Sequence, residues 1–553
     1  MPNCDEQNRG EHADLLIVGS GAAALVAAIS AHDRGVKVRI VERTDLVGGA
    51  AAVSGGGLWV PLNHLGGGST PDTREEALAY ARRLTDGRAD DTRVVNFIDT
   101  APRVLRYLTE HTPARFAPLD HPDYQLGQPG AKIDGRMVEP TLFDTATLGE
   151  WAPRLRQGRV FGLPMLLQEL VEHGAMVRPQ NLPMDVIADR LGRGLVAAGG
   201  ALVGMLLRGC LDRDIRIELN TRVVELVREG NRVVGANAER DGATARLGAS
   251  AVLLATGGYE WNAELKTKFL PGRLTHPASP PGLEGDGLVM AMEVGADLGN
   301  MTEAWWFPTI TDPAESYDGQ PLSRLCFAER IAPHSMMVNR RGRRFVNEAA
   351  NYNDMSKAFQ HFDPNAYDYT NLPCWAILDA QHRANYSLGT SLPGMPDPDW
   401  VISADTPEGL AVKVGIDPEG LRESLARFNE FARAGKDPDF GRGDSWYDRY
   451  LGDRESPHPN LGTIEQGPFY AVPIHPGALG TKGGPKIDTQ GRVLDVRGRA
   501  IPGLYGAGNV VAGLSGPGYY GAGTTLAIAV TEGFVSGETV AEDLEPAEAV
   551  ACV

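Results

Sequence analysis

The start of the chain contains the pattern that most constrains the fold. A short apolar run from Leu15 to Val18 leads directly into a Gly-x-Gly-x-x-Ala turn that begins at Gly19. A helical stretch with an alanine-rich packing face follows to about Arg34, and a second apolar strand then ends at Glu42. A buried strand, a glycine turn, a helix, a second strand and a terminal acid in this order predict a βαβ unit that binds a dinucleotide.

Each residue type in this unit has a physical role. Gly19 allows the tight turn, and Gly21 lets the backbone approach a pyrophosphate. Ala24 allows the helix to pack closely on the strand, and Glu42 can accept hydrogen bonds from ribose hydroxyls. The N–H groups at the start of the helix face the phosphates. The unit alone does not distinguish NAD from FAD.

Three further segments rich in glycine help to distinguish FAD from NAD. Glycine is abundant here, with 67 residues in a chain of 553. A loop with Gly48 and Gly49 and then Ser54 and three glycines could lie flat against a bulky ring system. Residues 251–258 form a predicted buried strand that ends in Ala-Thr-Gly-Gly, and residues 503–509 form another that ends in Gly-Ala-Gly-Asn.

Composition excludes several other classes of protein. The net charge of −18 argues against a nucleic-acid binder, which needs lysine and arginine for phosphate contacts. The five cysteines, an odd number without a Cys-x-x-Cys pair, indicate neither a disulfide framework nor a zinc site and favour a reducing, cytoplasmic compartment. The polar start of the chain is unlike a signal peptide, and no apolar run is long enough to span a membrane. Peripheral membrane attachment stays open, and no metal site is expected.

The glycine-rich segments together resemble FAD enzymes of the succinate dehydrogenase/fumarate reductase flavoprotein class. The resemblance implies an α/β fold with a Rossmann-type, glutathione-reductase-like FAD-binding domain that is discontinuous in the sequence. An α+β substrate domain is inserted at 276–476, so that the FAD domain consists of 1–275 and 477–553. No histidine near the first glycine-rich loop matches the covalent flavin attachment of succinate dehydrogenases, so noncovalent FAD is expected.

The resemblance also indicates which residues contact FAD. They lie in the four glycine-rich segments, in the small sheet and at the start of the last helix. The expected contacts are Gly19, Gly21, Ala22, Ala23, Ala24, Glu42, Arg43, Gly48, Gly49, Ala50, Ser54, Gly55, Gly56, Gly57, Val223, Ala255, Thr256, Gly257, Gly508, Asn509, Thr524 and Leu526.

A narrower resemblance, to the 3-ketosteroid Δ1-dehydrogenases, runs from about residue 13 to 540. Those enzymes use FAD to desaturate the ring bond next to a ketone. The motifs that carry the resemblance are residues 303–306, 328–330, 338–339, 344–348, 427–429, 442–443, 447–450, 459–461 and 479–484.

Such a desaturation removes a proton from the α-carbon and a hydride from the β-carbon. The proton is acidic enough only if the carbonyl oxygen is stabilised as it becomes enolate-like. In the resembled family a tyrosine hydroxyl and the N–H of a glycine four residues later grip the ketone, which implies Tyr519 and Gly523 here. This chain has Tyr520 where the family has proline, so Tyr520 could share or replace that role. Two tyrosines that merely pack the loop are the structural alternative.

The catalytic base is less well defined by the sequence. The family uses a tyrosine a few residues ahead of the segment 328–330, and this chain has no tyrosine immediately before it. Tyr317, further upstream, and Tyr352, further downstream, are the candidates, and Tyr124 matches a second, assisting tyrosine. A phenol must have its pKa lowered from about 10 to act as a base. Packing roles are the alternative for each of these tyrosines.

The remaining chain predicts a mixture of helices and strands. Helices are expected at 75–84, 94–111, 161–172, 182–207, 286–296, 418–434 and 524–542, with Asp286 as the cap of its helix. Strands are expected at 215–219, 221–227 and 232–239. The aromatic run 305–307 could wall a flat apolar pocket or belong to the core.

Four functions are compatible with the sequence. The first is dehydrogenation of a 3-oxosteroid, and the second is the same chemistry on a smaller ketone of cyclohexanone type. The third is the reverse reaction, an enone or fumarate-type reductase fed by another protein. The fourth is a flavoprotein that only binds FAD, as a structural or electron-carrying module. The partners expected for the first two are a small apolar ketone and an external electron acceptor. The sequence predicts neither the acceptor nor the oligomeric state.

Overall fold

A parallel sheet joins segments from the two ends of the chain. The computed structural model describes residues 12–545; the polar segment at the start, apart from its last residue, lies outside them. Strand β1 (Ala13–Val18) lies between β2 (Val38–Val41) and β11 (Ala243–Leu254) and is parallel to both. The sheet continues in parallel to β8 (Arg216–Glu218) beyond β2 and to β23 (Ala500–Gly506) beyond β11.

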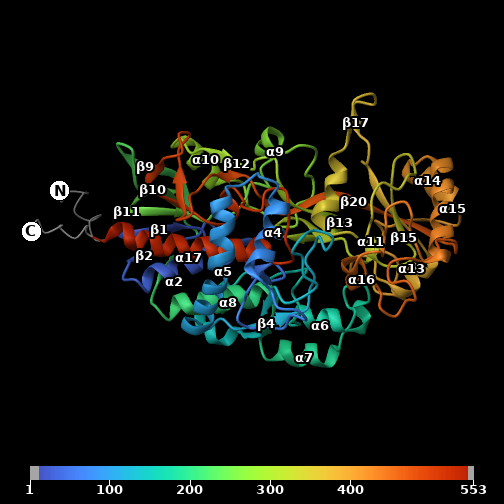
Figure 1. Ribbon diagram of the computed structural model, residues 1–553, viewed down its shortest axis with the longest axis horizontal. Coiled ribbons are helices and arrows are strands. Elements are labelled where there is room, and N and C mark those ends of the chain that lie inside the picture. Colours follow the sequence, from blue (N-terminus) through green and yellow to red (C-terminus); the bar gives the residue numbers. More distant parts are fainter. Residues whose placement is uncertain (1–11, 546–553) are drawn as a thin grey trace, which may run out of the picture.

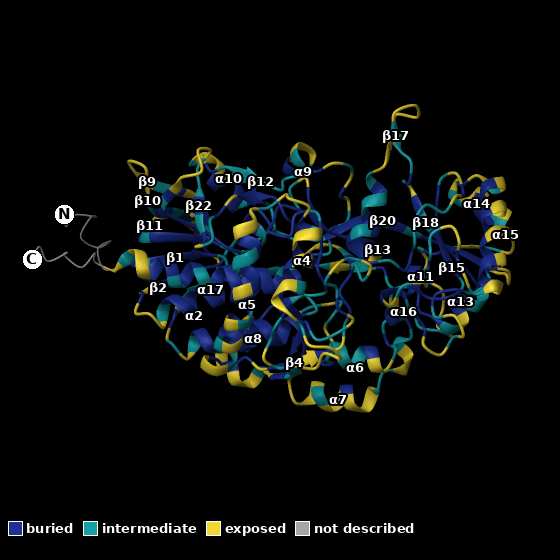
Figure 2. Ribbon diagram, in the orientation of Figure 1, coloured by how far each residue is buried: buried dark blue, intermediate teal, exposed yellow. Residues whose placement is uncertain are grey.

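Helices cover one face of this sheet. Leu15 and Ile17 of β1 pack in the same core as the helices, whereas Leu16 and Val18 pack in a second core on the opposite face. This is the alternation of a strand that is buried on both sides. Figure 1 shows the last helix, in red, beside the first ones, in blue, and Figure 2 shows the central strands buried. The covering helices are α2 (Ala22–His32), α5 (Asp91–His111), α8 (Ala198–Leu211) and α17 (Thr524–Leu544).

The opposite face carries an antiparallel arm and a helix. Strand β10 (Arg232–Arg240) pairs with the first half of β11, and β9 (Arg222–Glu229) pairs with β10; both strands lie where the sequence predicts strands. Helix α10 (Asp286–Glu293) packs beside them, but the prediction that Asp286 caps it is wrong. The N-cap is Gly285, without a side-chain cap, and the Asp286 carboxylate instead pairs with Arg222 at 2.9 Å.

A second sheet is built from the middle of the chain, with strand order β14-β13-β20-β18-β15 and β19 paired to β20. Its core on one side holds Leu421, Leu425 and Phe428 of α15 (Pro418–Ala434), which begins and ends as predicted. The strands are β13 (Ala304–Tyr317), β14 (Gln320–Leu325), β15 (Ser335–Asn339), β18 (Cys374–Asp379), β19 (Ile402–Ala404) and β20 (Phe469–Thr481).

Shorter elements complete the described chain. They are α3 (Gly49–Ala52), β3 (Leu58–Trp59), α4 (Arg74–Thr85), β4 (Phe116–Leu119), β5 (Met137–Pro140), β6 (Phe143–Asp144), η2 (Thr145–Arg154), α6 (Leu167–Glu172), η3 (Pro179–Asn181), α7 (Met184–Gly192), β7 (Leu195–Val196), α9 (Ala263–Phe269), β12 (Leu298–Gly299), α11 (Ala328–Ile331), α12 (Tyr352–Ser356), η4 (Lys357–Gln360), β16 (Phe362–Asp363), β17 (Asp368–Tyr369), α13 (Ala380–Asn385), α14 (Pro407–Val414), α16 (Trp446–Leu451), β21 (Gly484–Pro485), β22 (Arg492–Leu494) and η5 (Gly508–Val510).

Two predicted helices are wrong in extent. The helix predicted over 161–172 begins only at Leu167, because Gly162 and Pro164 interrupt the apolar pattern before it. The helix predicted over 182–207 is two helices, α7 and α8, separated by the short strand β7. Gly194, at φ 68°, turns the chain between them.

Three features of residues 12–545 bear on the expected class of protein. None of the helices in this range is both long and apolar enough to cross a bilayer. No cluster of histidine, cysteine, aspartate and glutamate within it could hold a metal ion. Cys210, Cys326 and Cys374 are buried and unpaired.

Candidate active site

One large pocket opens at the carboxyl ends of the parallel strands. Gly19 follows β1, Glu42 follows β2, Ala255 follows β11 and Gly508 lies just beyond β23, and all four line this pocket. Open parallel sheets bind their ligands at this edge, because the strand-to-helix turns gather there. The pocket continues to side chains of the second sheet, among them Phe307 of β13.

Two helices present uncapped N-termini beside this pocket. The N-caps of α2 and α17 are Gly21 and Gly523, neither of which makes a side-chain cap hydrogen bond. Both glycines line the pocket. The N–H groups of a first helical turn have no partner within the helix, so they are available to a bound anion or oxygen atom.

Glu42 is fixed where a ribose would be recognised. The side chain is buried, the Ser20 hydroxyl donates to Oε2 at 2.7 Å, and the Thr44 N–H donates to Oε1 at 2.9 Å. These donors hold the carboxylate at the end of β2. The glycine turn, the two helix ends and this acid therefore fit a dinucleotide such as FAD.

Most of the expected FAD contacts line the pocket. The residues that do so are Gly19, Gly21, Ala22, Ala23, Glu42, Arg43, Gly49, Ala50, Ser54, Gly55, Gly56, Gly57, Val223, Ala255, Thr256, Gly257, Gly508, Asn509 and Leu526. Ala24, Gly48 and Thr524 are outside the lining. Ala24 is buried in α2, and Thr524 donates its hydroxyl to the Gly521 carbonyl at 2.7 Å. Gly48 has φ 118° as the N-cap of α3.

A loop that the sequence does not indicate also lines the pocket. Residues 277–286 contribute to the wall near Arg43, whose Nη1 donates to the Gly282 carbonyl at 2.7 Å. The run Pro280-Pro281-Gly282 marks a turn, but nothing in it indicates a ligand.

Replacing Gly19 by alanine should remove the cofactor. Gly19 has φ 106°, and an added Cβ would lie 2.4 Å from the Ala255 carbonyl oxygen. The clash would push the turn away from the sheet at a cost of about 1–3 kcal/mol. We expect Gly19→Ala to be purified with less than about a tenth of the wild-type flavin, measured by absorbance. Gly192→Ala is the control, since a Cβ added there would meet nothing within 4 Å; equal flavin content in both variants would contradict the prediction.

Tyrosines from three distant segments meet in the pocket. Tyr124 follows β4, Tyr352 begins α12, and Tyr519 precedes α17. The Tyr124 ring centroid lies 5.2 Å from that of Tyr352 and 5.1 Å from that of Tyr519. The hydroxyls of Tyr124 and Tyr352 form a short hydrogen bond. All three tyrosines are buried and line the pocket.

Gly523 lies in the same short loop as Tyr519, four residues further along the chain. Its φ is 84°, and an added Cβ would lie 2.2 Å from the Gly57 carbonyl oxygen, so only glycine fits. The Tyr519 hydroxyl accepts a hydrogen bond from the Thr525 hydroxyl at 3.1 Å. A phenol and a helix N-terminus therefore border the same part of the pocket.

Two other predicted tyrosines lie elsewhere. Tyr520 does not line the pocket; its hydroxyl bonds the Thr85 hydroxyl at 2.7 Å, and its ring lies 5.0 Å from that of Trp59 in the core. Tyr317 lines the pocket at the end of β13, where its hydroxyl donates to the Gln157 carbonyl at 2.7 Å. Within residues 12–545, Tyr317 makes no ring contact with the group around Tyr124.

The aromatic run in β13 divides between pocket and core. Phe307 lines the pocket and stacks on Tyr352 at 4.0 Å, and Trp305 packs behind Tyr519 at 4.7 Å. Trp306 points to the other side of the strand and belongs to a separate core. Phe307 therefore forms part of the pocket wall, whereas Trp305 and Trp306 belong to the core.

Burial dominates the ionisation of this group. It raises the pKa of Tyr352 well above the ordinary value, while the hydrogen bond with Tyr124 acts in the opposite direction. Burial also lowers the pKa of His121, which lines the pocket, to about 4, so this imidazole is neutral at pH 7. The nearest imidazole to these tyrosines is therefore not a source of positive charge at pH 7.

Comparisons with known proteins agree with this site. The family model described as an FAD binding domain matches residues 14–526. The chain is 40% identical to 4-oxocyclohexanecarboxylate 2-dehydrogenase of Sinomonas cyclohexanicum, over 96% of this chain and 92% of that protein. It is 35% identical to 3-oxosteroid 1-dehydrogenase of Mycolicibacterium smegmatis, over 96% of this chain and 98% of that protein.

A solved structure shares the whole fold. The 3-ketosteroid Δ1-dehydrogenase from Sterolibacterium denitrificans, crystallised in complex with 1,4-androstadiene-3,17-dione, matches with a TM-score of 0.90 at 35% identity. The match covers 96% of this chain and 100% of that chain.

Proposed function

Because this chain belongs to the FAD binding domain family and to the 3-ketosteroid Δ1-dehydrogenase group within it, we propose that it desaturates a ring ketone of the 3-oxosteroid type. It is an FAD-dependent oxidoreductase that acts on CH–CH groups. The observation that carries the proposal is the meeting of Tyr124, Tyr352 and Tyr519 in the pocket, next to Gly523.

The arrangement of the strands supports the expected domain division. The parallel strands come from both sides of the second sheet in the sequence, so a Rossmann-type FAD domain of 1–275 and 477–553 would hold the cofactor. The inserted domain of 276–476 would then contribute most of the second sheet. Strand β20 runs across residue 476, so that strand would join the two domains.

The residues that would hold FAD are the turn at Gly19, Glu42 and the N-termini of α2 and α17. Bound FAD would supply the oxidant that accepts the hydride from the β-carbon. The reaction then requires an external electron acceptor, and the cysteine usage favours a cytoplasmic location.

Tyr519 and Gly523 would hold the ketone oxygen. The Tyr519 hydroxyl accepts from Thr525, so its own proton is free to be donated to a carbonyl. The Gly523 N–H at the start of α17 would be the second donor, and the helix dipole favours the negative charge that develops there. Two donors in this buried site would make the α-proton more acidic.

Tyr352 would take that proton. We assign the base to Tyr352 because its hydroxyl is paired with Tyr124 beside Tyr519, whereas the Tyr317 hydroxyl is bonded to the Gln157 carbonyl. Tyr124 would donate to the Tyr352 oxygen and so stabilise it when deprotonated. Tyr520 would have a packing role, since its hydroxyl is bonded to Thr85.

The lining favours an apolar ring substrate. It includes Leu119, Phe161, Leu167, Val171, Met176 and Leu451. A second candidate is a monocyclic ketone with a carboxylate. The 40% identity to a 4-oxocyclohexanecarboxylate 2-dehydrogenase favours it, and Arg159, which also lines the pocket, is suitable for a carboxylate. Arg156, its neighbour in the lining, is paired with Asp318.

An anaerobic reduction assay tests the function and separates the two substrates. The yellow holoenzyme is mixed without oxygen with a saturated 3-oxosteroid, with 4-oxocyclohexanecarboxylate or with unsubstituted cyclohexanone. We expect rapid bleaching of the flavin by the steroid. Bleaching by the carboxylate alone would favour the second candidate, and a flavin that no ketone bleaches would overturn the proposed function.

A further inference from the structure

Two motifs singled out in the sequence have no role in the mechanism so far. They are residues 328–330 and residues 479–484, and each contains a buried cation. Arg330 has 0% of its surface exposed and Lys482 has 1%. Burying a charge is costly unless nearby groups compensate for it, so each needs an explanation.

Arg330 holds the backbone that leads into Tyr352. Its Nη1 donates to the carbonyls of Glu348 and, at 3.0 Å, Ala350, and its Nε donates to the Cys326 carbonyl at 2.9 Å. Its Nη2 is buried and has no hydrogen-bond partner among the described residues. The guanidinium thus ties down the residues just before Tyr352 and keeps unused hydrogen-bonding capacity.

Lys482 holds the backbone just before Tyr519. Its Nζ donates to the Gly518 carbonyl at 2.6 Å and to the Gly516 carbonyl at 3.2 Å. The same nitrogen lies 4.0 Å from the centroid of the Trp305 ring and 6.0 Å from that of Tyr519. The ammonium group therefore holds the loop and lies beside the phenol that would grip the ketone.

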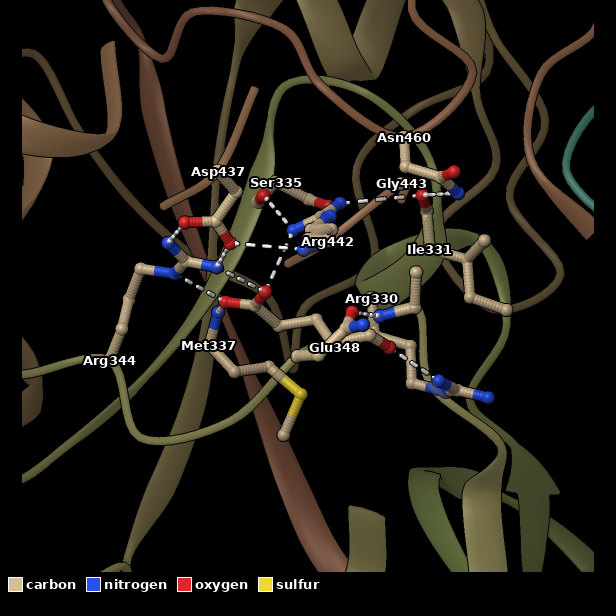
Figure 3. Close-up of polar contacts among 12 residues, drawn as sticks. Arg330, Ile331, Ser335, Met337, Arg344, Glu348, Asp437, Arg442, Gly443 and Asn460 are labelled. Atoms are coloured by element: carbon tan, nitrogen blue, oxygen red, sulfur yellow. Dashed lines mark hydrogen bonds and ion pairs between the residues drawn. The ribbon is translucent and has the colours of Figure 1, made fainter. Parts of the chain in front are cut away.

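Neither cation has a carboxylate in ion-pair contact among residues 12–545, in contrast to their neighbours. Figure 3 shows Arg344 and Arg442 meeting the carboxylates of Glu348 and Asp437, while the Arg330 guanidinium lies apart from this group. Arg344 contacts Glu348 at 2.7 Å and Asp437 at 2.8 Å, so charges cancel in that network.

The acids near the two cations are engaged elsewhere. Asp448 accepts from Asn347 at 2.9 Å, and Glu303 contacts Arg88 at 3.2 Å. Neither acid makes an ion pair with Arg330 or Lys482 in the described part of the chain, so the positive charges beside the tyrosines are balanced only at longer range.

We propose that Arg330 and Lys482 form an electropositive clamp that positions Tyr352 and Tyr519 and stabilises the negative charge that the reaction places between them. The proposal rests on the proposed function. A deprotonated Tyr352 carries the charge before proton transfer, and the enolate oxygen at Tyr519 carries it afterwards. Both cations are positioning residues, because they act through the tyrosines.

The groups that face the two tyrosines support this electrostatic role. Tyr352 faces Tyr124, Tyr447 and Tyr519, and Tyr519 faces Tyr124, Trp305 and Lys482. Asp354 and Asp448 lie behind this group, with Lys357 beside Asp354 at 3.2 Å. Burial lowers the pKa of Lys482 to about 7, so the clamp should weaken as the pH rises above neutrality.

Binding of 4-nitrophenol to the oxidised holoenzyme tests the clamp without turnover. Its phenolate has the ring shape and the oxygen charge of a cyclic enolate, and its absorbance reports ionisation. At pH 6.5, wild type should bind the ionised form and lower the apparent pKa of the bound phenol. Lys482→Met and Arg330→Met should each raise that pKa by about one unit and weaken binding about tenfold.

Variants separate a charge effect from a folding effect. Arg330→Lys should recover part of the loss, because it keeps the charge. Lys132→Met and Arg383→Lys alter buried cations that hold the Pro71 and Leu392 carbonyls outside the pocket lining, and both should behave as wild type. Unfolding temperatures identify any variant that fails to fold, and Lys482→Met alone then tests the loss of charge if Arg330→Met does not fold.

The outcomes distinguish this inference from the proposed function. Wild type that binds only the neutral phenol, or clamp variants that match the two controls, would overturn the clamp. An intact clamp effect with a flavin that no ketone bleaches would overturn the function alone.

Discussion

Phenylalanine in place of Tyr352 should lower the rate of flavin reduction by a ketone about a hundred- to ten-thousand-fold, the range for loss of a general base. The ring that stacks on Phe307 at 4.0 Å is kept, and only the hydroxyl paired with Tyr124 is lost. Substrate affinity should change little, because in the proposed mechanism the hydroxyl would face the α-carbon and not the carbonyl. Anaerobic stopped-flow reduction at several ketone concentrations separates the two effects.

Tyr450→Phe is the matched control. Tyr450 is a buried tyrosine that packs against His121 and does not line the pocket. Its hydroxyl has no hydrogen-bond partner within residues 12–545. Its variant should keep the wild-type rate. A Tyr352→Phe enzyme within about twofold of wild type would show that another group removes the proton.

The pH dependence of the same step gives a second test of Tyr352. Burial raises its pKa, so the deprotonated base is scarce at neutral pH and becomes more abundant as the pH rises. The reduction rate of wild type should therefore increase towards alkaline pH, at most about tenfold per unit, and less steeply above neutrality, where Lys482 loses its charge. Tyr352→Phe should lose this dependence, and a wild-type rate that falls with pH would contradict the assignment.

The part of the site that depends on local geometry could be predicted from the sequence. A strand, a glycine turn and a helix lie within one short segment, so Gly19 and Glu42 could be placed at the end of adjacent strands. The start of α17 at Thr524 was also predictable, because glycine precedes a long apolar helix.

Residues that depend on long-range contacts could not be placed in this way. Tyr352 begins a helix of only five residues, and nothing near it in the sequence indicates a pocket. Its role follows from contacts with Tyr124 and Tyr519, which are distant in the chain. Tyr317 has an equally plausible sequence context, but the end of β13 carries it to Gln157 instead.

The sequence also does not predict which of two adjacent tyrosines faces the pocket. Tyr519 and Tyr520 are equivalent by composition, and a loop without a regular period gives no rule for which side chain faces a ligand. In the structure, the hydroxyl of Tyr519 meets Thr525 at the pocket and that of Tyr520 meets Thr85 in the core. Substitution of Tyr519 should therefore affect the reaction rate, whereas substitution of Tyr520 should affect stability.

Tyr519→Phe should slow flavin reduction by about two orders of magnitude, because the enolate oxygen loses one of two donors at a cost of about 3 kcal/mol. Flavin content and the unfolding temperature should barely change, because the ring remains packed against Trp305 at 4.7 Å. Stopped-flow reduction and thermal unfolding of the same preparations measure both quantities.

Tyr520→Phe should have the reverse profile. It leaves the buried Thr85 hydroxyl without the partner at 2.7 Å, so it should cost about 1–3 kcal/mol of stability while changing the rate little. The pair of variants thus separates a donor to substrate from a structural hydroxyl. If Tyr520→Phe were slow and Tyr519→Phe were fully active, Tyr520 would be the residue that holds the ketone. Full activity of both on the best ketone would mean that neither phenol grips the carbonyl, and the oxyanion would then depend on the N-terminus of α17 alone.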